Sequence, residues 1–335
     1  MIPRSNPTLT ILSFALSIAT LCPAGRGEVS VASNDAEHVK SWMGVIERLE
    51  LDSHMAADGR LLIATHDGAR IDEYCELADG SAHLLDETLP HPEGGGHDRT
   101  AILIEVADRE DLGVVLDALA ERAPYLTGWA ASMKGSSGFT LESPLIAAWV
   151  DGGPFQEEWS SQNELVHRCA QLQTLERFGQ LPYWLAEGIA WRVEYGLLES
   201  VYCFPNRSGF VRVEEHVEWP DQLEALFSRR KQKRDALSFE ELTELQRGEY
   251  SQSAALKSYG AIQYLGDDDP DALGRWLDAL VDHREHHGKV VEEDGSWHWI
   301  PGYEVPLEIQ FELFANEFGE RTLESMTKAF RKGVD

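Results

Sequence analysis

The chain has 335 residues, 43% of them hydrophobic, which is enough for a substantial core arranged as one large or two small domains. This composition excludes a disordered protein. Acidic residues outnumber lysine and arginine by 58 to 29, giving a formal net charge of −29, and such an excess repels phosphate backbones and anionic lipid. Nucleic acids and membrane surfaces are therefore not expected as partners.

The first 24 residues have the pattern of a secretion signal peptide. Arg4 provides a positive start, Leu9–Leu21 is a short apolar run, and the small residue Ala24 follows. The run is too short for a stable bilayer span. We expect cleavage near Ala24 and export to a periplasmic or extracellular compartment. The alternative is a lipoprotein attached through Cys22, in which case the protein would be held at a membrane.

The remainder of the chain changes character near Gly152 and Gly153. Residues 25–58 are assigned to a linker and an N-terminal helix, residues 59–152 to an α/β part, and residues 153–335 to a mainly helical part. Strand-like runs come first and helical periodicity dominates later, so the predicted fold class is α+β.

In the α/β part, short apolar and β-branched runs predict strands over Arg60–Thr65 and Ala101–Val106. Leucine and valine recur at helical spacing over Asp108–Arg122, which predicts a helix. Phe139–Val150 has the composition of one or two strands, interrupted at Pro144 because proline cannot donate a hydrogen bond within a sheet. This part is therefore expected to supply the sheet.

The helical part begins with two consecutive helices, over Phe155–Phe178 and Pro182–Tyr195. Gly179 ends the first, and a proline suits the first turn of the second. A short strand-like run and five further helices are expected after them. The run is Gly209–Val213, and the helices cover Gln222–Lys231, Glu249–Leu265, Asp271–His286, Pro306–Phe318 and Glu320–Lys332.

Four polar residues on the first two helices form a pattern with chemical meaning. Asn163, Glu164 and His167 lie on the first helix, and Glu187 lies on the second. Residues four apart share a helix face, so Asn163 and His167 point the same way. In the pattern HExxH, two histidines at this spacing bind zinc and the intervening glutamate is the general base for zinc-bound water. Here the pattern is NExxH.

The continuation of this segment resembles the gluzincin zinc peptidases of the bacterial peptidase MA-like group. In that group HExxH is followed by a proline, a Trp-Leu pair and EGxA, and the matching residues here are Pro182, Trp184, Leu185, Glu187, Gly188 and Ala190. The resemblance implies a zincin-like catalytic domain in which Glu187 is the third zinc ligand. It also implies a tyrosine that steadies the oxyanion, for which Tyr250 and Tyr259 are candidates.

Asn163 weakens the implied zinc site, because an amide oxygen is a poorer zinc donor than an imidazole nitrogen. Only His167 and Glu187 remain as strong ligands, whereas catalytic zinc has three protein ligands and a water. Zinc binding is therefore expected to be weak or absent and hydrolysis lost or reduced, which predicts a pseudopeptidase or a peptide-binding protein.

Two alternatives remain open. One is an active zinc peptidase that acts on peptides or proteins, with Asn163, His167 and Glu187 as ligands and Glu164 as general base. The other is a structural cell-envelope protein without a ligand.

Three cysteines follow the signal-like segment: Cys75, Cys169 and Cys203. An exported compartment permits one disulfide among them, and their spacing does not select the pair. The chain has no CxxC or CxxH spacing of the kind found in thiolate zinc sites, so structural roles are expected for all three.

Overall fold

A computed structural model of the chain describes residues 31–89, 99–152, 159–204, 216–228, 237–246, 249–291, 297–300 and 303–332. The signal-like segment with Arg4 and Cys22 lies outside these residues, as does the predicted strand Gly209–Val213. Within the described residues, no helix combines the length and apolar character needed to cross a bilayer.

The α/β part is built on a five-stranded mixed sheet with the order β1-β2-β3-β5-β4. The strands are β1 (Asp52–Ala56), β2 (Leu61–Thr65), β3 (Ala101–Val106), β4 (Gly138–Leu141) and β5 (Ile146–Val150). β2, β3 and β5 are parallel, and β1 and β4 pair antiparallel at the two edges. The predicted strands are confirmed, with Pro144 in the turn between β4 and β5. The sequence does not predict β1, because this edge strand is polar and mostly exposed.

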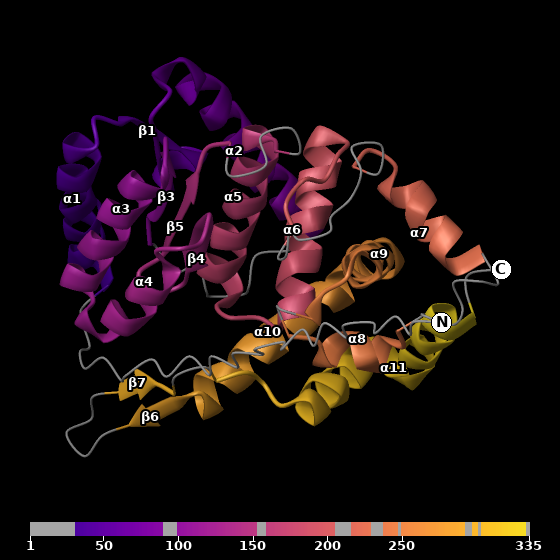
Figure 1. Cartoon of the computed structure of the whole chain (residues 1–335). Helices are drawn as coiled ribbons and strands as arrows, with labels where there is room; N and C mark the ends of the chain where they lie inside the picture. The colour runs from indigo at the N-terminus through magenta and orange to yellow at the C-terminus, as the bar shows by residue number, and fades with distance from the viewer. Residues whose placement is uncertain are drawn as a thin grey trace, which may run out of the picture.

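Helices cover both faces of the sheet (Figure 1). One layer contains α1 (Val31–Arg48), α3 (Arg109–Arg122) and α4 (Thr127–Met133), and the other contains α2 (Ile71–Thr88) and α5 (Ser161–Phe178). Alternate residues of β3 face the two layers, because side chains alternate along a strand. Ile102 and Ile104 pack with the α3 side, whereas Leu103 packs with the α2 and α5 side. The mixed fold is consistent with the predicted α+β class.

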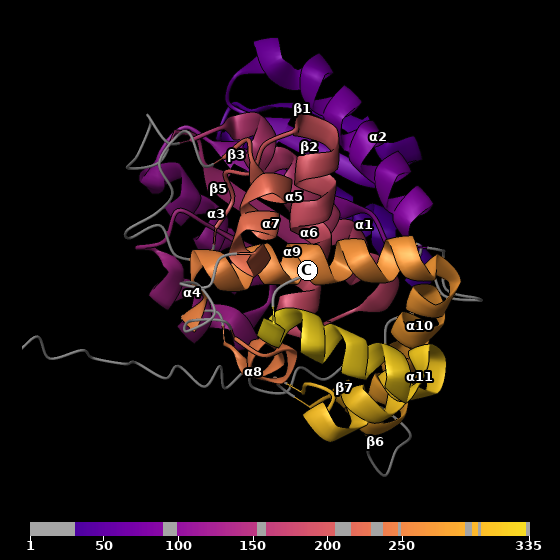
Figure 2. The same cartoon turned by 90° about the vertical axis from the view of Figure 1, so that its right-hand side faces the viewer.

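The second half of the chain is mainly helical and packs beyond α5 (Figures 1 and 2). Its elements are α6 (Tyr183–Leu198), α7 (Trp219–Ser228), α8 (Phe239–Glu244), α9 (Gln252–Asp268), α10 (Pro270–His287) and α11 (Leu307–Lys332), with β6 (Lys289–Val291) paired to β7 (Trp297–Trp299). The predicted helices are found, with shifted ends where the described residues reach them, and α2, α4 and α8 are additional. The two helices expected near the C-terminus meet at a kink at Gly319, where φ is 76°. Buried tryptophans, among them Trp184, Trp191 and Trp276, fill the core of this half.

Local signals fix the ends of α5 and α6. Ser160 caps α5, its hydroxyl accepting a hydrogen bond from the backbone N–H of Asn163 at 3.3 Å. Gly179, with φ of 65°, ends the helix. Pro182 then occupies the N-cap position of α6. The short connection returns the chain so that α6 lies against α5.

Gly188 permits the close approach of α6 and α9. A Cβ atom at this position would lie 2.8 Å from the carbonyl oxygen of Ser258 and 2.8 Å from Cγ1 of Ile262. We expect Gly188→Ala to lower the free energy of unfolding by about 1–3 kcal/mol, because α9 must move. Gly113→Ala in α3 is the control, since nothing lies within 4 Å of its added atom, and it should raise stability by about 0.5–1 kcal/mol. Urea unfolding measures the stability of both variants. Equal changes in the free energy of unfolding would contradict the close packing of α6 against α9.

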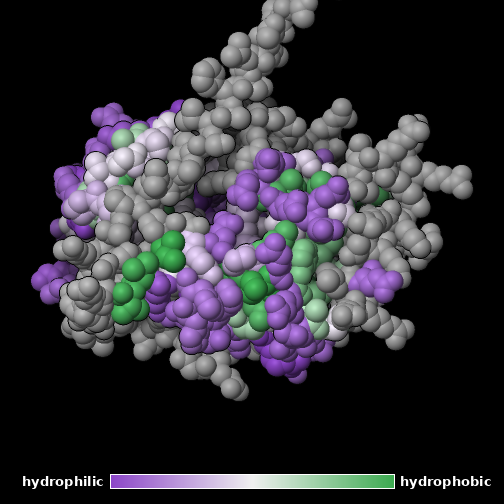
Figure 3. All heavy atoms as spheres, turned by 90° about the horizontal axis from the view of Figure 1, so that it is seen from below, coloured by the Kyte–Doolittle hydropathy of each residue, from purple (hydrophilic) through white to green (hydrophobic). Residues whose placement is uncertain are grey.

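Three exposed apolar side chains lie on β6 and directly after β7. Val290, Val291 and Ile300 are 40%, 69% and 37% exposed. Figure 3 shows this side of the molecule from below, where separate hydrophobic groups lie among hydrophilic side chains. Single exposed apolar residues of this kind are ordinary on protein surfaces.

Candidate functional site

α5 and α6 bring His167 and Glu187 together. Nε2 of His167 lies 3.1 Å from Oε2 of Glu187. Gln171, one turn further along α5, donates from Nε2 to Oε1 of Glu187 at 2.8 Å. His167 and Glu187 are 5% and 9% exposed. The two strongest ligands expected from the paired-helix pattern therefore share a buried contact.

Glu194, two turns beyond Glu187 on α6, lies on the other side of the imidazole. Its Oε2 is 3.0 Å from Nδ1 of His167. Its Oε1 accepts hydrogen bonds from the backbone N–H groups of Tyr202, at 2.6 Å, and Cys203, at 3.2 Å. Glu194 is fully buried, and these donors satisfy its carboxylate. It holds the segment after α6 against the helix pair.

Asn163 is turned toward Glu194. Its Nδ2 donates to Oε1 of Glu194 and to the backbone carbonyl of Ser200, both at 2.9 Å. Both partners are acceptors, so the NH₂ end of the amide must face them. Asn163 is 3% exposed. Its amide group orients the Glu194 carboxylate and bonds to the turn after α6.

The carboxylate of Glu164 is bonded to the guanidinium of Arg168 and to the thiol of Cys203. Oε1 of Glu164 accepts from Arg168, with contacts of 2.8 Å to Nε and 2.6 Å to Nη2. The Cys203 thiol donates to Oε2 at 3.2 Å. Arg168 also donates from Nη1 to the hydroxyl of Thr140 on β4, at 2.8 Å. The residue expected to be the general base is therefore one partner of a buried ion pair.

His167 lies between two carboxylates, and its pKa changes accordingly. Burial by itself lowers the pKa, but the hydrogen bonds to Glu187 and Glu194 outweigh it and raise the pKa to about 9. At neutral pH the ring is therefore protonated, with one nitrogen donating to each carboxylate. The indole of Trp191 packs beside it, with ring centroids 6.2 Å apart.

The two candidate tyrosines occupy different places. Tyr250 is buried, and its hydroxyl lies 3.2 Å from the Ser258 hydroxyl. Its ring lies 6.1 Å from that of Trp191, which packs beside His167, and burial raises the pKa of Tyr250. Tyr259 packs between Tyr195 and Trp219, with ring centroids at 5.7 and 5.5 Å. Tyr250 thus lies nearer the candidate site, and Tyr259 belongs to an aromatic cluster of the core.

The zinc ligand set implied by the gluzincin resemblance does not fit a metal here. The NH₂ group of Asn163 faces Glu194 and Ser200, and this group has no lone pair to offer a cation. His167 and Glu187 then supply two donors, one fewer than a catalytic zinc site uses.

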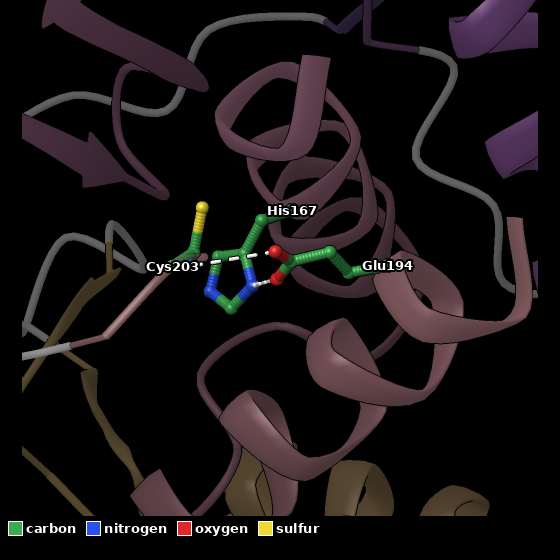
Figure 4. Close-up of side chains that lie close together, drawn as sticks. All are labelled: His167, Glu194 and Cys203. Atoms are coloured by element: carbon green, nitrogen blue, oxygen red, sulfur yellow. Dashed lines mark hydrogen bonds and ion pairs between the residues drawn. The ribbon is translucent and has the colours of Figure 1, made fainter. Parts of the chain in front are cut away.

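A second set of donors includes Glu194, which lies at Nδ1 of His167, and Cys203, which lies close to the ring (Figure 4). One donor atom each from His167, Glu194 and Cys203 lie within 4.8 Å of one another, and all three residues are buried. Cys75, Cys169 and Cys203 are thiols, and no disulfide joins them. Cys203 thus lies in the candidate site, which its expected structural role did not anticipate.

The sequence interpretation omitted Arg168, Gln171, Glu194, Ser200 and Cys203 from the site. Glu194 could have been found, because it follows Glu187 by seven positions and therefore lies on the same helix face. Cys203 and Ser200 carry no local signal. Their positions depend on the turn after α6, where Glu199 has a left-handed φ of 52°.

Comparison with known proteins adds no relative. Neither protein-family models nor curated proteins match this chain. The resemblance to gluzincins therefore depends on the motif residues of α5 and α6 and on the packing of these two helices.

Proposed function

We propose that this chain is an exported, zincin-like domain of the gluzincin type that binds extended peptide segments without hydrolysing them. The ion pair between Glu164 and Arg168 is the observation that carries the proposal. A general base must accept a proton from water, and both oxygens of this carboxylate are already engaged, Oε1 by the Arg168 guanidinium at 2.6 Å and Oε2 by the Cys203 thiol at 3.2 Å. Asn163 acts in the same direction, since it removes a zinc ligand.

The edge strand β4 supports peptide binding. The Val150 N–H donates to the Ser137 carbonyl at 2.9 Å, and hydrogen-bonded pairs alternate along an antiparallel ladder. Phe139 and Leu141 are therefore bonded to β5, whereas the N–H and C=O of Thr140 face outward. β4 is the last strand of the sheet among the described residues, and an extended peptide can pair with such an edge. Thr140 also bonds to Gln171, at 2.7 Å, which places this edge beside the candidate site.

The test uses fluorescein-labelled, unfolded casein with the purified protein. We expect a rise in fluorescence anisotropy on binding, and no cleavage by mass spectrometry with or without added zinc. Thr140→Pro removes the outward N–H and should weaken binding by about tenfold, the effect of one main-chain hydrogen bond. Thr140→Val, which keeps the N–H and loses the hydroxyl, is the matched control and should bind nearly as well.

Other results would contradict the proposal in different ways. Zinc-dependent cleavage of casein would establish the alternative of an active peptidase. Absence of both binding and cleavage would favour the structural envelope protein. Equal binding by the proline and valine variants would show that peptides do not pair with β4.

A further inference from the structure

We propose that His167, Glu194 and Cys203 form a binding site for a thiophilic divalent cation such as zinc, on the Nδ1 side of the imidazole. This goes beyond the proposed function, because neither peptide binding nor the absence of hydrolysis requires a metal. It also differs from the ligand set of the gluzincin resemblance, which consists of Glu187 and positions 163 and 167.

The chemistry of the three donors suits such a cation. Zinc binds imidazole nitrogen, thiolate sulfur and carboxylate oxygen, and three protein ligands are the number found where zinc keeps one open position. The three donor atoms already lie within 4.8 Å of one another, so small shifts, including a widening of the 3.0 Å contact between Nδ1 and Oε2 of Glu194, bring them around one ion. They come from α5, α6 and the segment after α6, which a shared ion would tie together.

Outer hydrogen bonds orient Glu194 for this role. Its Oε1 is occupied by the backbone N–H groups of Tyr202 and Cys203 and by the amide of Asn163. Oε2 is left facing Nδ1 of His167. Hydrogen bonds of this kind fix the orientation of metal ligands and strengthen binding. The asparagine that disrupts the gluzincin ligand set thus supports a ligand of the second set.

The hydrogen bond of the imidazole to Glu187 also orients His167 for binding an ion through Nδ1. Nε2 of His167 lies 3.1 Å from the acceptor Oε2 of Glu187. A proton on Nε2 donating to Glu187 leaves the Nδ1 lone pair for a cation, because the bond made by one ring nitrogen decides the role of the other. Glu187 is then an outer partner of the histidine and not a ligand.

Binding of a divalent cation leaves the net charge of the surrounding buried side chains unchanged. The buried group consists of three carboxylates, of Glu164, Glu187 and Glu194, facing Arg168 and the protonated His167. Binding displaces the Nδ1 proton of His167 and the thiol proton of Cys203, and both protons pass to solvent. Two positive charges leave and two arrive, so the net charge of the buried group does not change.

The test is a titration of the chelator-treated protein with cobalt(II), a spectroscopic substitute for zinc. We expect a near-ultraviolet charge-transfer band from thiolate to cobalt, which competing zinc abolishes. Cys203→Ser should remove the band and weaken cobalt affinity at least tenfold, because a soft ligand is replaced by a weak hard donor. Cys75→Ser, which changes a partly buried thiol of α2, should leave the band unchanged. Circular dichroism checks folding, and Cys203→Ala replaces the serine variant if that variant does not fold.

Three results would overturn the inference. The first is a charge-transfer band that survives in the Cys203 variants, and the second is absence of cobalt uptake by the folded wild-type protein. The third is cobalt uptake that produces no charge-transfer band and that disappears in Glu187→Gln. This result would place the ion on the Nε2 side of the imidazole. Casein binding in the same preparation keeps the two proposals separate, because bound casein without bound metal contradicts only this inference.

Discussion

Glu194→Gln should lower the free energy of unfolding by about 3–5 kcal/mol, the cost typical of removing one partner from a buried ion pair. The substitution keeps the shape of the side chain and removes the charge that faces His167 at 3.0 Å. The carboxylate now accepts hydrogen bonds from the Asn163 amide and the Tyr202 N–H. The new amide NH₂ group must face one of these donors, with which it cannot form a hydrogen bond. The measurement is urea unfolding at pH 7. Glu199→Gln, an exposed residue at the end of the same helix, is the matched control and should change stability by less than about 0.5 kcal/mol.

The same variant should change how stability depends on pH. His167 has a pKa of about 9 in the folded protein against 6.5 ordinarily, so protonation favours the folded state. This stabilisation is fully present below pH 6.5 and is lost as the pH rises through 9. Wild-type stability should therefore decline over that interval, and the decline should be smaller in Glu194→Gln. A variant that is no less stable than Glu199→Gln, with an unchanged pH profile, would show that Glu194 does not hold the imidazolium.

Asn163→His should raise zinc affinity by more than about 100-fold, beyond the effect typical of a supporting residue around a metal. The change completes HExxH on α5, where His167 and Glu187 already lie 3.1 Å apart. The new imidazole can donate to Glu194 in place of the Asn163 amide, which aims its other nitrogen at the ion. Isothermal titration calorimetry measures the affinity. No gain in a folded variant would contradict the proposed gluzincin-like geometry.

Hydrolysis should require a second change. Glu164 stays paired with Arg168 in Asn163→His, so we expect zinc binding without cleavage of unfolded casein. Asn163→His combined with Arg168→Gln frees the carboxylate, and a general base contributes about 10²–10⁴-fold to a rate. Cleavage by the single variant would show that the ion pair does not block the base. Arg168→Gln alone is the control and should remain inactive.

The parts of the fold that could be predicted are those with strong local signals. The i, i+4 spacing within NExxH and the glycine and proline between the helices predict α5 and α6 well. α2 escaped prediction because its buried face consists largely of small or polar residues, including Ala78, Ser81 and Ala82. No recurring leucine or valine marks this face in the sequence as it does in α3, and tertiary packing makes the helix a cover of the sheet.

The candidate site was predictable only in its helical portion. Helix periodicity relates His167 to positions on α5 and Glu187 to positions on α6. The contact between Cys203 and Glu164 joins residues 39 positions apart, and no periodicity extends across the turn after α6. The ion pair of Glu164 and Arg168 has the ordinary i, i+4 spacing of surface helices, so the sequence alone does not reveal that it is buried.

α5 belongs to two hydrophobic cores at once. Leu165, Cys169 and Leu172 pack with the sheet, while Val166 and Ala170 pack with the helical half. Selection for a stable fold therefore preserves this helix whether or not its polar residues act in catalysis. Chemical activity and architecture can then evolve at different rates within one helix, because substitution of its polar residues leaves both cores intact.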